Sequence, residues 1–398
     1  MFSAGHLLPL LLAFVVHTST VLARPHSYAV WAADSATKRG QGNGLSSSGQ
    51  PSVSYEHGEL QWGLRQLYER TGNKTYYNYI VSGANNIVYD NGTVHGGYTI
   101  SDYSLDPVRT GPTFLYLYSR TKQAKWKTAA DIFRGQLNGH PRTAEGQFWH
   151  KLRYFNQGWL DGIYMGDVFY AQYTKDFQPT NATAWADIAA QFTLIYRNTL
   201  QAPGSANYTG LLYHGYDYSH TAVWASPDRG HSPEIWDRAL GWYFMAMVDV
   251  LDIFPESNSG YASIQNILRA LAPKLRDAAD LKSGVWWLVM TQPGRAQNYF
   301  ESSGTAMFVY SLLKGVRMGY IPDSDGSIVK AAKKAYQYMI ANWVVANPDG
   351  TMDWTSTVEV GSLSGNGTFE YYVGVPTALN DLKGVAAFLL ASLEYERL

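Results

Sequence analysis

Three segments of the chain place polar residues, aromatic rings and glycines where an ordinary core helix would carry Leu or Ile. They span residues 149–162, 214–243 and 298–307. The first contains Asp161 in the sequence Trp159-Leu160-Asp161-Gly162, and a carboxyl group in such a setting can donate and accept a proton. An aspartate at a helix start can equally be an N-cap, which accepts backbone N–H bonds. The adjacent Trp159 and Gly162 favour a catalytic site.

The position of Asp161 at a helix start and a role as proton donor make opposite demands on its pKa. A helix N-terminus lowers the pKa of a nearby carboxyl group, whereas a proton donor at working pH needs a raised pKa. A second carboxylate and apolar rings close to Asp161 would raise its pKa. We therefore expect such neighbours around it in the folded protein.

The segments lie within a recurring pattern of one helix rich in small and aromatic residues, a short turn and a second amphipathic helix. The sixth copy has only its first helix, so its partner could come from an N-terminal segment. Six unequal pairs suit a closed ring better than an open array. The copies begin near Glu56, Asp106, Asp161, Arg238, Ser303 and Lys383.

The pattern predicts an all-α fold, a single (α/α)6 toroid domain over residues 24–398. Small residues in the first helix of each pair would let the inner helices crowd around an axis. An irregular helical bundle is the structural alternative, because it would use the same periodicity. In a toroid the N-termini of the inner helices converge on one mouth, and the catalytic residues should lie there.

The amino-acid composition excludes several classes of function. The 398 residues include 31 basic and 32 acidic residues, a net charge of -1, so there is no positive field for a phosphate backbone and we expect no nucleic acid partner. Aromatic residues make up 15% and include 13 Trp and 30 Tyr, whose rings can stack on sugar faces. The chain has no Cys, which excludes disulfides, thiolate metal sites and a cysteine nucleophile.

The N-terminal residues 1–23 have the form of a signal peptide, with an apolar run followed by small residues ending at Ala23. A buried N-terminal helix is the alternative. Five Asn-x-Thr sequences support a secreted, extracellular glycoprotein, and no later apolar stretch predicts a membrane span. The acceptor residues are Asn73, Asn91, Asn181, Asn207 and Asn366.

The three segments, with 380–384 near the C-terminus, resemble the signatures of glycoside hydrolase family 105, the unsaturated rhamnogalacturonyl hydrolases. The resemblance runs in order from about Tyr55 to Tyr395, nearly the whole mature chain. The blocks Trp159-Leu160-Asp161-Gly162 and Trp236-x-Arg238-Ala239-Leu240-Gly241-Trp242 are specific in combination.

This resemblance implies an (α/α)6 barrel, no metal or cofactor, and an oligosaccharide substrate with a terminal 4,5-unsaturated galacturonic acid linked to rhamnose. Its acid/base aspartate matches Asp161. A second pocket carboxylate matches Asp106, although Asp102 is close by. Arg238 and Lys151 would hold the uronate carboxylate, Arg by a bidentate fork and Lys as a point charge. His214 would hydrogen-bond the sugar. The pocket walls would be Tyr55, Trp159, Trp236, Trp242 and Tyr299.

Other readings remain open. Arg238 and Lys151 could be solvated surface charges, His214 a structural histidine, and the rings part of the core. An ordinary glycosidase of the same fold would use Asp106 and Asp161 as an acid and base pair at the anomeric carbon. An unsaturated glucuronyl hydrolase acting on other lyase products is a further alternative. A glycan-binding protein without activity would not need a proton donor at Asp161.

Overall fold

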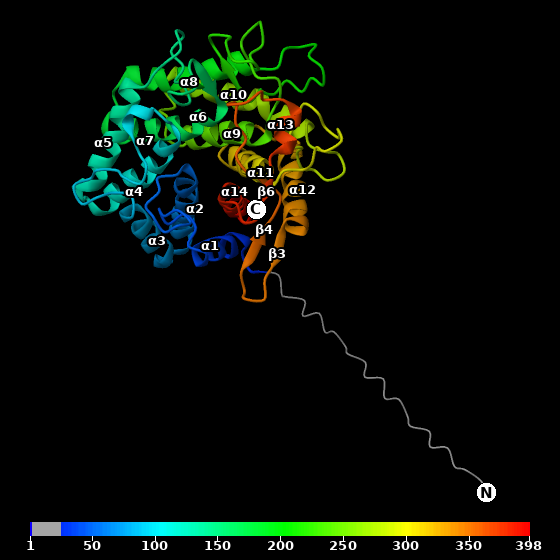
Figure 1. The fold of residues 1–398 in the computed structure, drawn as a ribbon, viewed down its shortest axis with the longest axis horizontal. Helices are drawn as coiled ribbons and strands as arrows, with labels where there is room; N and C mark the ends of the chain where they lie inside the picture. The colour runs from blue at the N-terminus through cyan, green and yellow to red at the C-terminus, as the bar shows by residue number, and fades with distance from the viewer. Residues whose placement is uncertain (2–24) are drawn as a thin grey trace.

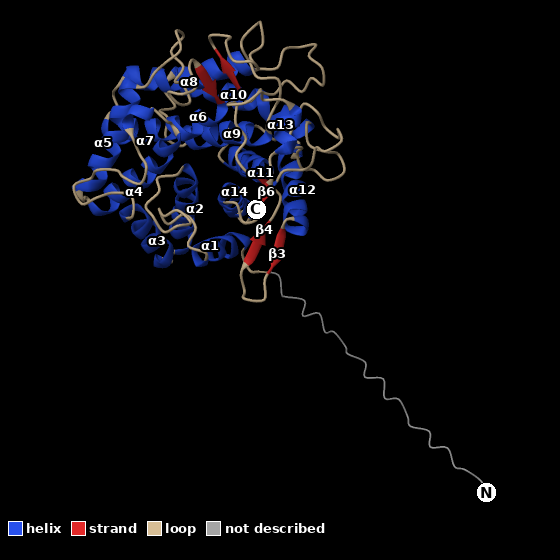
Figure 2. Cartoon of the chain, viewed as in Figure 1, coloured by secondary structure: helices blue, strands red, loops and turns tan. Residues whose placement is uncertain are grey.

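The computed structural model describes Met1 and residues 25–398. The predicted signal peptide, residues 1–23, lies outside the described residues apart from Met1. The chain forms one ring of helices with very little strand (Figures 1 and 2). Within the described part, no helix is both long and apolar enough to cross a membrane.

Six helical rods form the inner ring. Two of them are extended at their N-termini: η2 (Asp106–Thr110) runs into α4, and α6 (Leu160–Gly162) continues through the π-helix η3 (Ile163–Asp167) into α7. The rods are α2 (Tyr55–Thr71), α4 (Gly111–Thr121), α6 to α7 (Val168–Phe177), α9 (Asp237–Leu251), α11 (Ser302–Arg317) and α14 (Leu382–Tyr395).

The inner rods close on themselves. Helix α2 packs against η2, η2 against η3, η3 against α9, α9 against α11, α11 against α14, and α14 returns to α2. The first and last helices of the chain therefore lie side by side, as the blue and red ends of the ribbon show (Figure 1). This closure confirms the predicted toroid.

An outer helix packs against each inner rod. Helix α1 packs against α14, which confirms that an N-terminal segment completes the sixth pair. The outer helices are α1 (Tyr28–Lys38), α3 (Lys74–Asn85), α5 (Ala124–Gly139), α8 (Ala182–Thr199), α10 (Ser259–Asp277) and α12 (Ser327–Asn342). The remaining elements are η1 (Ile100–Asp102), α13 (Phe369–Gly374) and six strands: β1 (Gln157–Trp159), β2 (Gly215–Asp217), β3 (Val344–Ala346), β4 (Met352–Trp354), β5 (Thr357–Val358) and β6 (Thr377–Ala378).

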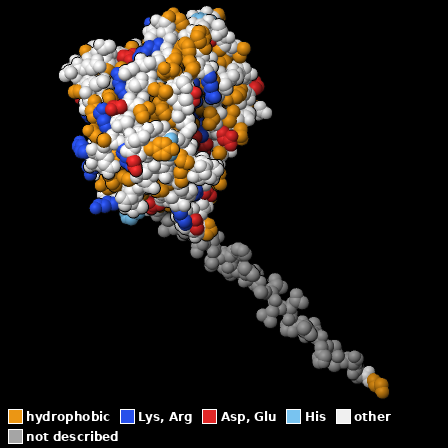
Figure 3. Space-filling view, turned by 60° about the vertical axis from the view of Figure 1, so that its left-hand side comes forward, with side chains coloured by type: hydrophobic (Ala, Val, Ile, Leu, Met, Phe, Trp, Pro, Cys, Tyr) orange, Lys and Arg blue, Asp and Glu red, His pale blue; other side chains and the backbone are white. Residues whose placement is uncertain are grey.

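Side-chain pattern separates the two layers. In α12 only one stripe is buried, at Ile328, Ala332, Ala335, Tyr336 and Met339, the spacing of an amphipathic surface helix. In α9 every residue is buried, as expected of a helix that is enclosed on all sides. The inner helices also need small residues: a Cβ on Gly58 of α2 would lie 2.5 Å from the Arg109 carbonyl oxygen. The outer surface is mixed, with acidic and basic side chains interspersed on the face seen in Figure 3.

Buried charged groups inside the ring link neighbouring inner rods. Arg109 Nη2 donates to Glu59 Oε2 at 3.2 Å and to the Tyr164 hydroxyl at 2.6 Å, and the Tyr164 hydroxyl donates to Glu59 Oε2 at 2.7 Å. Neither charged side chain is exposed to solvent. The π-helix carries Tyr164, whose ring stacks on Trp242 with centroids 5.0 Å apart. This network is thereby connected to a wall of the site described next.

Candidate active site

Asp161 lies in the first turn of α6, directly after strand β1. The N-cap of this helix is Trp159, so the Asp161 carboxyl group is not the helix cap. Strand β1 pairs with β2, with Trp159 opposite Gly215, and the Leu160 N–H donates to the His214 carbonyl at 3.0 Å. A Cβ on Gly215 would lie 2.8 Å from the Gly158 carbonyl oxygen, so glycine permits this close pairing. The two strands bring His214 to Asp161, with Nε2 and Oδ2 3.0 Å apart.

His214 is fully buried and held from its other side. Its Nδ1 is 2.6 Å from the hydroxyl of Tyr372 in α13. When Tyr372 donates to Nδ1, the ring proton stands on Nε2 and faces the Asp161 carboxylate. The His214 ring also packs against Trp159 and Trp236, with centroids 5.3 Å and 5.0 Å away.

The surroundings of Asp161 act on its pKa in opposite directions. Burial raises the pKa, but His214 lowers it by more, through its charge and its hydrogen bond, so the pKa lies below its usual value of 3.8. The sequence led us to expect a raised pKa, caused by a second carboxylate. That expectation was wrong for the free protein, because the group in contact with the Asp161 carboxyl is the His214 imidazole and not a second carboxylate.

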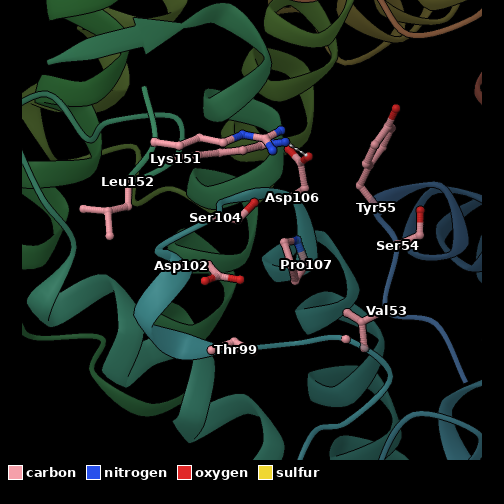
Figure 4. A pocket seen from close by; sticks show the side chains of 12 residues that line it. Val53, Ser54, Tyr55, Thr99, Asp102, Ser104, Asp106, Pro107, Lys151 and Leu152 are labelled. Carbon is pink, nitrogen blue, oxygen red and sulfur yellow. Dashed lines mark hydrogen bonds and ion pairs between the residues drawn. The ribbon is translucent and has the colours of Figure 1, made fainter. Parts of the chain in front are cut away.

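Asp106 starts η2 and is already partnered. Lys151 Nζ donates to its Oδ2 at 2.5 Å (Figure 4). His150 Nε2 lies 3.5 Å from its Oδ1. Backbone bonds fix this arrangement: the Leu105 N–H donates to the His150 carbonyl, and the Leu152 N–H to the Asp102 carbonyl. Burial is the main reason that the pKa of His150 lies well below its usual range, so this ring is neutral near pH 7.

These side chains line a pocket of about 270 Å³, near the lower end of the roughly 300–1,000 Å³ typical of ligand pockets. Eight of the ten residues predicted from the sequence line it, His214 contacts Asp161 from behind, and Tyr299 does not line the pocket. The eight are Tyr55, Asp106, Lys151, Trp159, Asp161, Trp236, Arg238 and Trp242.

A wider pocket of about 580 Å³ adjoins the first. Tyr55, Asp106, Lys151 and Arg153 line both. Figure 4 shows the wider pocket, with Asp106 and Lys151 together on one side and Tyr55 on the other. Asp102 lines only this wider pocket, so the ambiguity between Asp102 and Asp106 resolves to Asp106 for the smaller one.

Aromatic rings form the walls of the smaller pocket. Trp159 stacks against both Tyr154 and His150, each with a centroid distance of 4.5 Å. Trp242 meets Tyr55 edge to face at 6.2 Å. Burial raises the pKa of Tyr55 well above its usual value, so Tyr55 presents a neutral hydroxyl. Flat rings beside polar groups suit a sugar ring, which has both apolar faces and hydroxyl edges.

Arg238 occupies the pocket wall but its donors are already in use. Nε donates to Ser303 Oγ at 2.7 Å, Nη1 to the Glu359 carbonyl at 2.6 Å, and Nη2 to Glu301 and the Val358 carbonyl. A guanidinium has five N–H donors, so about one remains. As arranged here, Arg238 has no free fork for a carboxylate. Its bonds instead hold residues 358–359 and the start of α11 against the pocket.

Arg153 is a pocket residue that the sequence did not single out. It lines both pockets, its guanidinium lies 4.9 Å from the Tyr154 ring centroid, and it has no acidic partner within the described chain. Its place two residues after Lys151 was a usable signal. Tyr372, His150 and Ser362 were also missed, and Tyr372 is 158 residues from the histidine that it contacts, beyond any local signal.

Comparison with known proteins agrees with the geometry. The family model described as Glycosyl Hydrolase Family 88 matches residues 31–398. A glycoside hydrolase from family 105 of C. acetobutylicum ATCC 824 is 36% identical, with a TM-score of 0.87, over 94% of this chain and 100% of that chain.

More distant structures share the fold. A possible GH105 member from Salmonella enterica is 21% identical with a TM-score of 0.74, over 97% of this chain and 99% of that chain. An unsaturated glucuronyl hydrolase from Bacillus sp. GL1 is 15% identical with a TM-score of 0.61, over 93% and 94%. The family model matches nearly the whole chain, so the chain belongs to glycosyl hydrolase family 88 as that model defines it. Its similarity to the C. acetobutylicum enzyme identifies it as a glycoside hydrolase of family 105.

Proposed function

We propose that this enzyme releases a terminal 4,5-unsaturated galacturonic acid from rhamnogalacturonan-derived oligosaccharides by hydrating the enol-ether double bond. The observation that carries the proposal is one buried carboxyl group, Asp161, in an aromatic pocket that also contains an uncommitted cation, Arg153. A planar acidic sugar matches both features. The Bacillus sp. GL1 relative is named an unsaturated glucuronyl hydrolase, which is consistent with an unsaturated uronate as the substrate class.

The reaction needs a single acid/base group. The C4 carbon of the enol ether is electron-rich and accepts a proton from Asp161, which leaves an oxocarbenium-like centre at C5. The Asp161 carboxylate then takes a proton from water as the water oxygen bonds to C5. The product is a hemiketal, which opens to a ketone and releases the leaving sugar without enzymatic attack on the anomeric carbon.

Substrate binding would bring Asp161 toward its acid form. The free carboxyl group has a lowered pKa, caused mainly by His214. A bound uronate adds a negative charge and excludes water, and both raise the pKa of a neighbouring carboxyl group. Arg153 would hold the uronate carboxylate in place of Arg238, while the Asp106–Lys151 pair would face ring hydroxyls from the border of the two pockets.

Turnover in deuterated water tests the bond attacked. Addition across the double bond places solvent deuterium at C4 of the released sugar, which NMR and mass analysis detect. An early product without label at C4 and with its double bond intact would identify the ordinary glycosidase reaction. Loss of enol-ether absorbance on a panel of lyase products shows which leaving-side sugar the enzyme accepts, because C4 is no longer a stereocentre and galacturonyl and glucuronyl units give the same unsaturated residue.

We also propose that the enzyme is secreted and glycosylated. Asn73, Asn91, Asn207 and Asn366 are exposed at the surface of the toroid. Asn207 Nδ2 donates to the Thr291 carbonyl at 2.7 Å, so its amide nitrogen is less available than the others. Mass analysis of protein from the culture medium before and after glycan removal tests this proposal, and an N-terminus at Met1 would contradict the signal peptide.

A further inference from the structure

Tyr372 reaches the active site only through His214. Its hydroxyl oxygen lies 2.6 Å from Nδ1 of that ring, and the hydroxyl has no other hydrogen-bond partner in the part of the chain that the structure describes. Tyr372 is 1% exposed and does not line the pocket of Asp161. Its hydroxyl therefore cannot touch a bound sugar, and any effect that it has on the reaction passes through the histidine.

The surroundings fix the position of Tyr372. Its ring stacks on Trp236, with centroids 5.7 Å apart, and Trp236 lines the pocket. Arg295 pairs with Glu370 in the first turn of α13, and its guanidinium lies 3.8 Å from the centroid of the Phe369 ring. The hydroxyl of Tyr372 is thereby held against the histidine from one direction.

Nδ1 of His214 is the acceptor for the hydroxyl proton of Tyr372. It can accept only while the neutral ring carries its own proton on Nε2. With a proton on Nδ1, in the other neutral tautomer or in the imidazolium ion, the ring would donate to the hydroxyl and leave the Tyr372 proton buried without an acceptor. Such an unpaired donor costs free energy, so Tyr372 favours the tautomer protonated on Nε2.

This tautomer decides which oxygen of Asp161 can carry the proton of the acid form. Nε2 lies 3.0 Å from Oδ2, which is buried, whereas the Asp161 side chain as a whole is 12% exposed. Oδ1 is therefore the oxygen left to face the pocket. A proton on Oδ2 would oppose the proton on Nε2, unless the ring first moved its proton to Nδ1, which Tyr372 disfavours. The acid form thus keeps its proton on Oδ1.

We propose that Tyr372 is a positioning residue for the proton donor, because it holds the ring proton of His214 on Nε2 and so keeps the Asp161 proton on the pocket-facing Oδ1. The proton then moves from Oδ1 to C4 of the enol ether, and water returns a proton to Oδ1 as its oxygen bonds to C5. This role rests on the proposed function, in which Asp161 is the acid. The tautomer of His214 is measurable without substrate.

Nitrogen-15 NMR of the full chain, labelled at the histidine ring nitrogens, tests the tautomer. In the wild-type protein the His214 signals, assigned by their loss in His214→Gln, should show a protonated Nε2 and an unprotonated Nδ1. Asp161→Asn provides a neutral partner whose amide can either donate to Nε2 or accept from it. Adding Tyr372→Phe to Asp161→Asn should shift the ratio of the two tautomers toward protonated Nδ1 by up to about ten-fold, the factor for one buried hydrogen bond.

Steady-state kinetics test the consequence for the reaction. Without the Tyr372 hydroxyl, the acid proton of Asp161 can move to Oδ2 and bond to the histidine, so Tyr372→Phe should lower kcat by up to about ten-fold. KM should stay nearly unchanged, since Tyr372 does not line the pocket. Tyr336→Phe is the matched control: its buried hydroxyl donates to Ser392 at 2.9 Å, between α12 and α14. This control should lower the melting temperature comparably and keep the wild-type kcat.

Three results would overturn the positioning role. They are a protonated Nδ1 on His214 in the wild-type protein, an unchanged tautomer ratio when Tyr372→Phe is added to Asp161→Asn, and a wild-type kcat in a folded Tyr372→Phe protein. The wild-type spectrum decides the tautomer even if Tyr372→Phe does not fold. Tautomers that behave as expected in a protein that places no deuterium at C4 contradict only the proposed function.

Discussion

Nε2 of His214 lies 3.0 Å from Oδ2 of Asp161, and Tyr372 holds the opposite nitrogen of the same ring. The contact lowers the pKa of the carboxyl group that we propose as the proton donor. It also fixes the direction in which that carboxyl group points. His214 therefore affects both the pH dependence and the geometry of the site.

His214→Gln should shift the pH dependence of kcat/KM. The histidine lowers the pKa of Asp161, so its removal raises that pKa and keeps the acid form present at higher pH. We expect the alkaline limb of the profile to move to higher pH, together with a lower maximum because the carboxyl group is less well oriented. A profile with unchanged limbs would show that Asp161 is not the group titrated.

Asp161→Asn should leave the protein folded and nearly inactive. The amide matches the carboxyl group in size but cannot exchange a proton, and loss of one acid/base group costs about 10²- to 10⁴-fold in rate. The same residue gives and takes the proton in the proposed reaction, so the larger value is expected. Thermal melts and steady-state rates on unsaturated oligosaccharides measure the two effects, and substantial turnover by a normally melting variant would remove Asp161 from the chemistry.

Arg153→Gln should raise KM for an unsaturated uronyl substrate more than it lowers kcat. The variant keeps hydrogen-bonding ability but loses the uncommitted cation of the pocket. The methyl ester of the same substrate is the control, since it has no carboxylate for Arg153 to bind. An equal loss on acid and ester would assign the carboxylate to another residue.

Arg238→Lys should act mainly on structure. An ammonium has three donors and cannot reproduce the four bonds of Arg238 to Ser303, Glu301 and the carbonyls of residues 358 and 359. We expect a lower melting temperature and similar activity losses on the acid and ester substrates. Selective loss on the acid alone would instead restore Arg238 as the carboxylate-binding residue.

Glu59→Ala should destabilise the ring by about 3–5 kcal/mol, because it leaves the buried guanidinium of Arg109 without its counter-charge. Denaturant unfolding measures the change in the free energy of unfolding. Glu69→Ala is the surface comparison: its pair with Arg65 is half-exposed, and such pairs contribute about 0–1 kcal/mol. Similar losses in the two variants would mean that the buried pair does not stabilise the ring.

Much of the architecture could be predicted because it depends on the spacing of apolar residues within each helix. Inner helices are buried on all sides and outer helices on one side, so the spacing of apolar residues differs between them, as in α9 and α12. Asp106, Asp161 and Arg238 each lie at the start of an inner rod, and a closed ring brings these starts to one mouth. Because the starts of the inner rods meet at this mouth, the residues that line the pocket could be predicted.

The sequence by itself determined the ring and the position of Asp161 at the start of an inner rod, since helix periodicity and helix starts depend on neighbouring residues. Only the tertiary structure decided what each polar side chain does there. Arg238 is satisfied by carbonyls about 120 residues away, and Asp161 faces a histidine carried by a paired strand. Hydrogen-bond partners and desolvation depend on which distant loops meet, and these two factors set both the free donors of a guanidinium and the pKa of a carboxyl group.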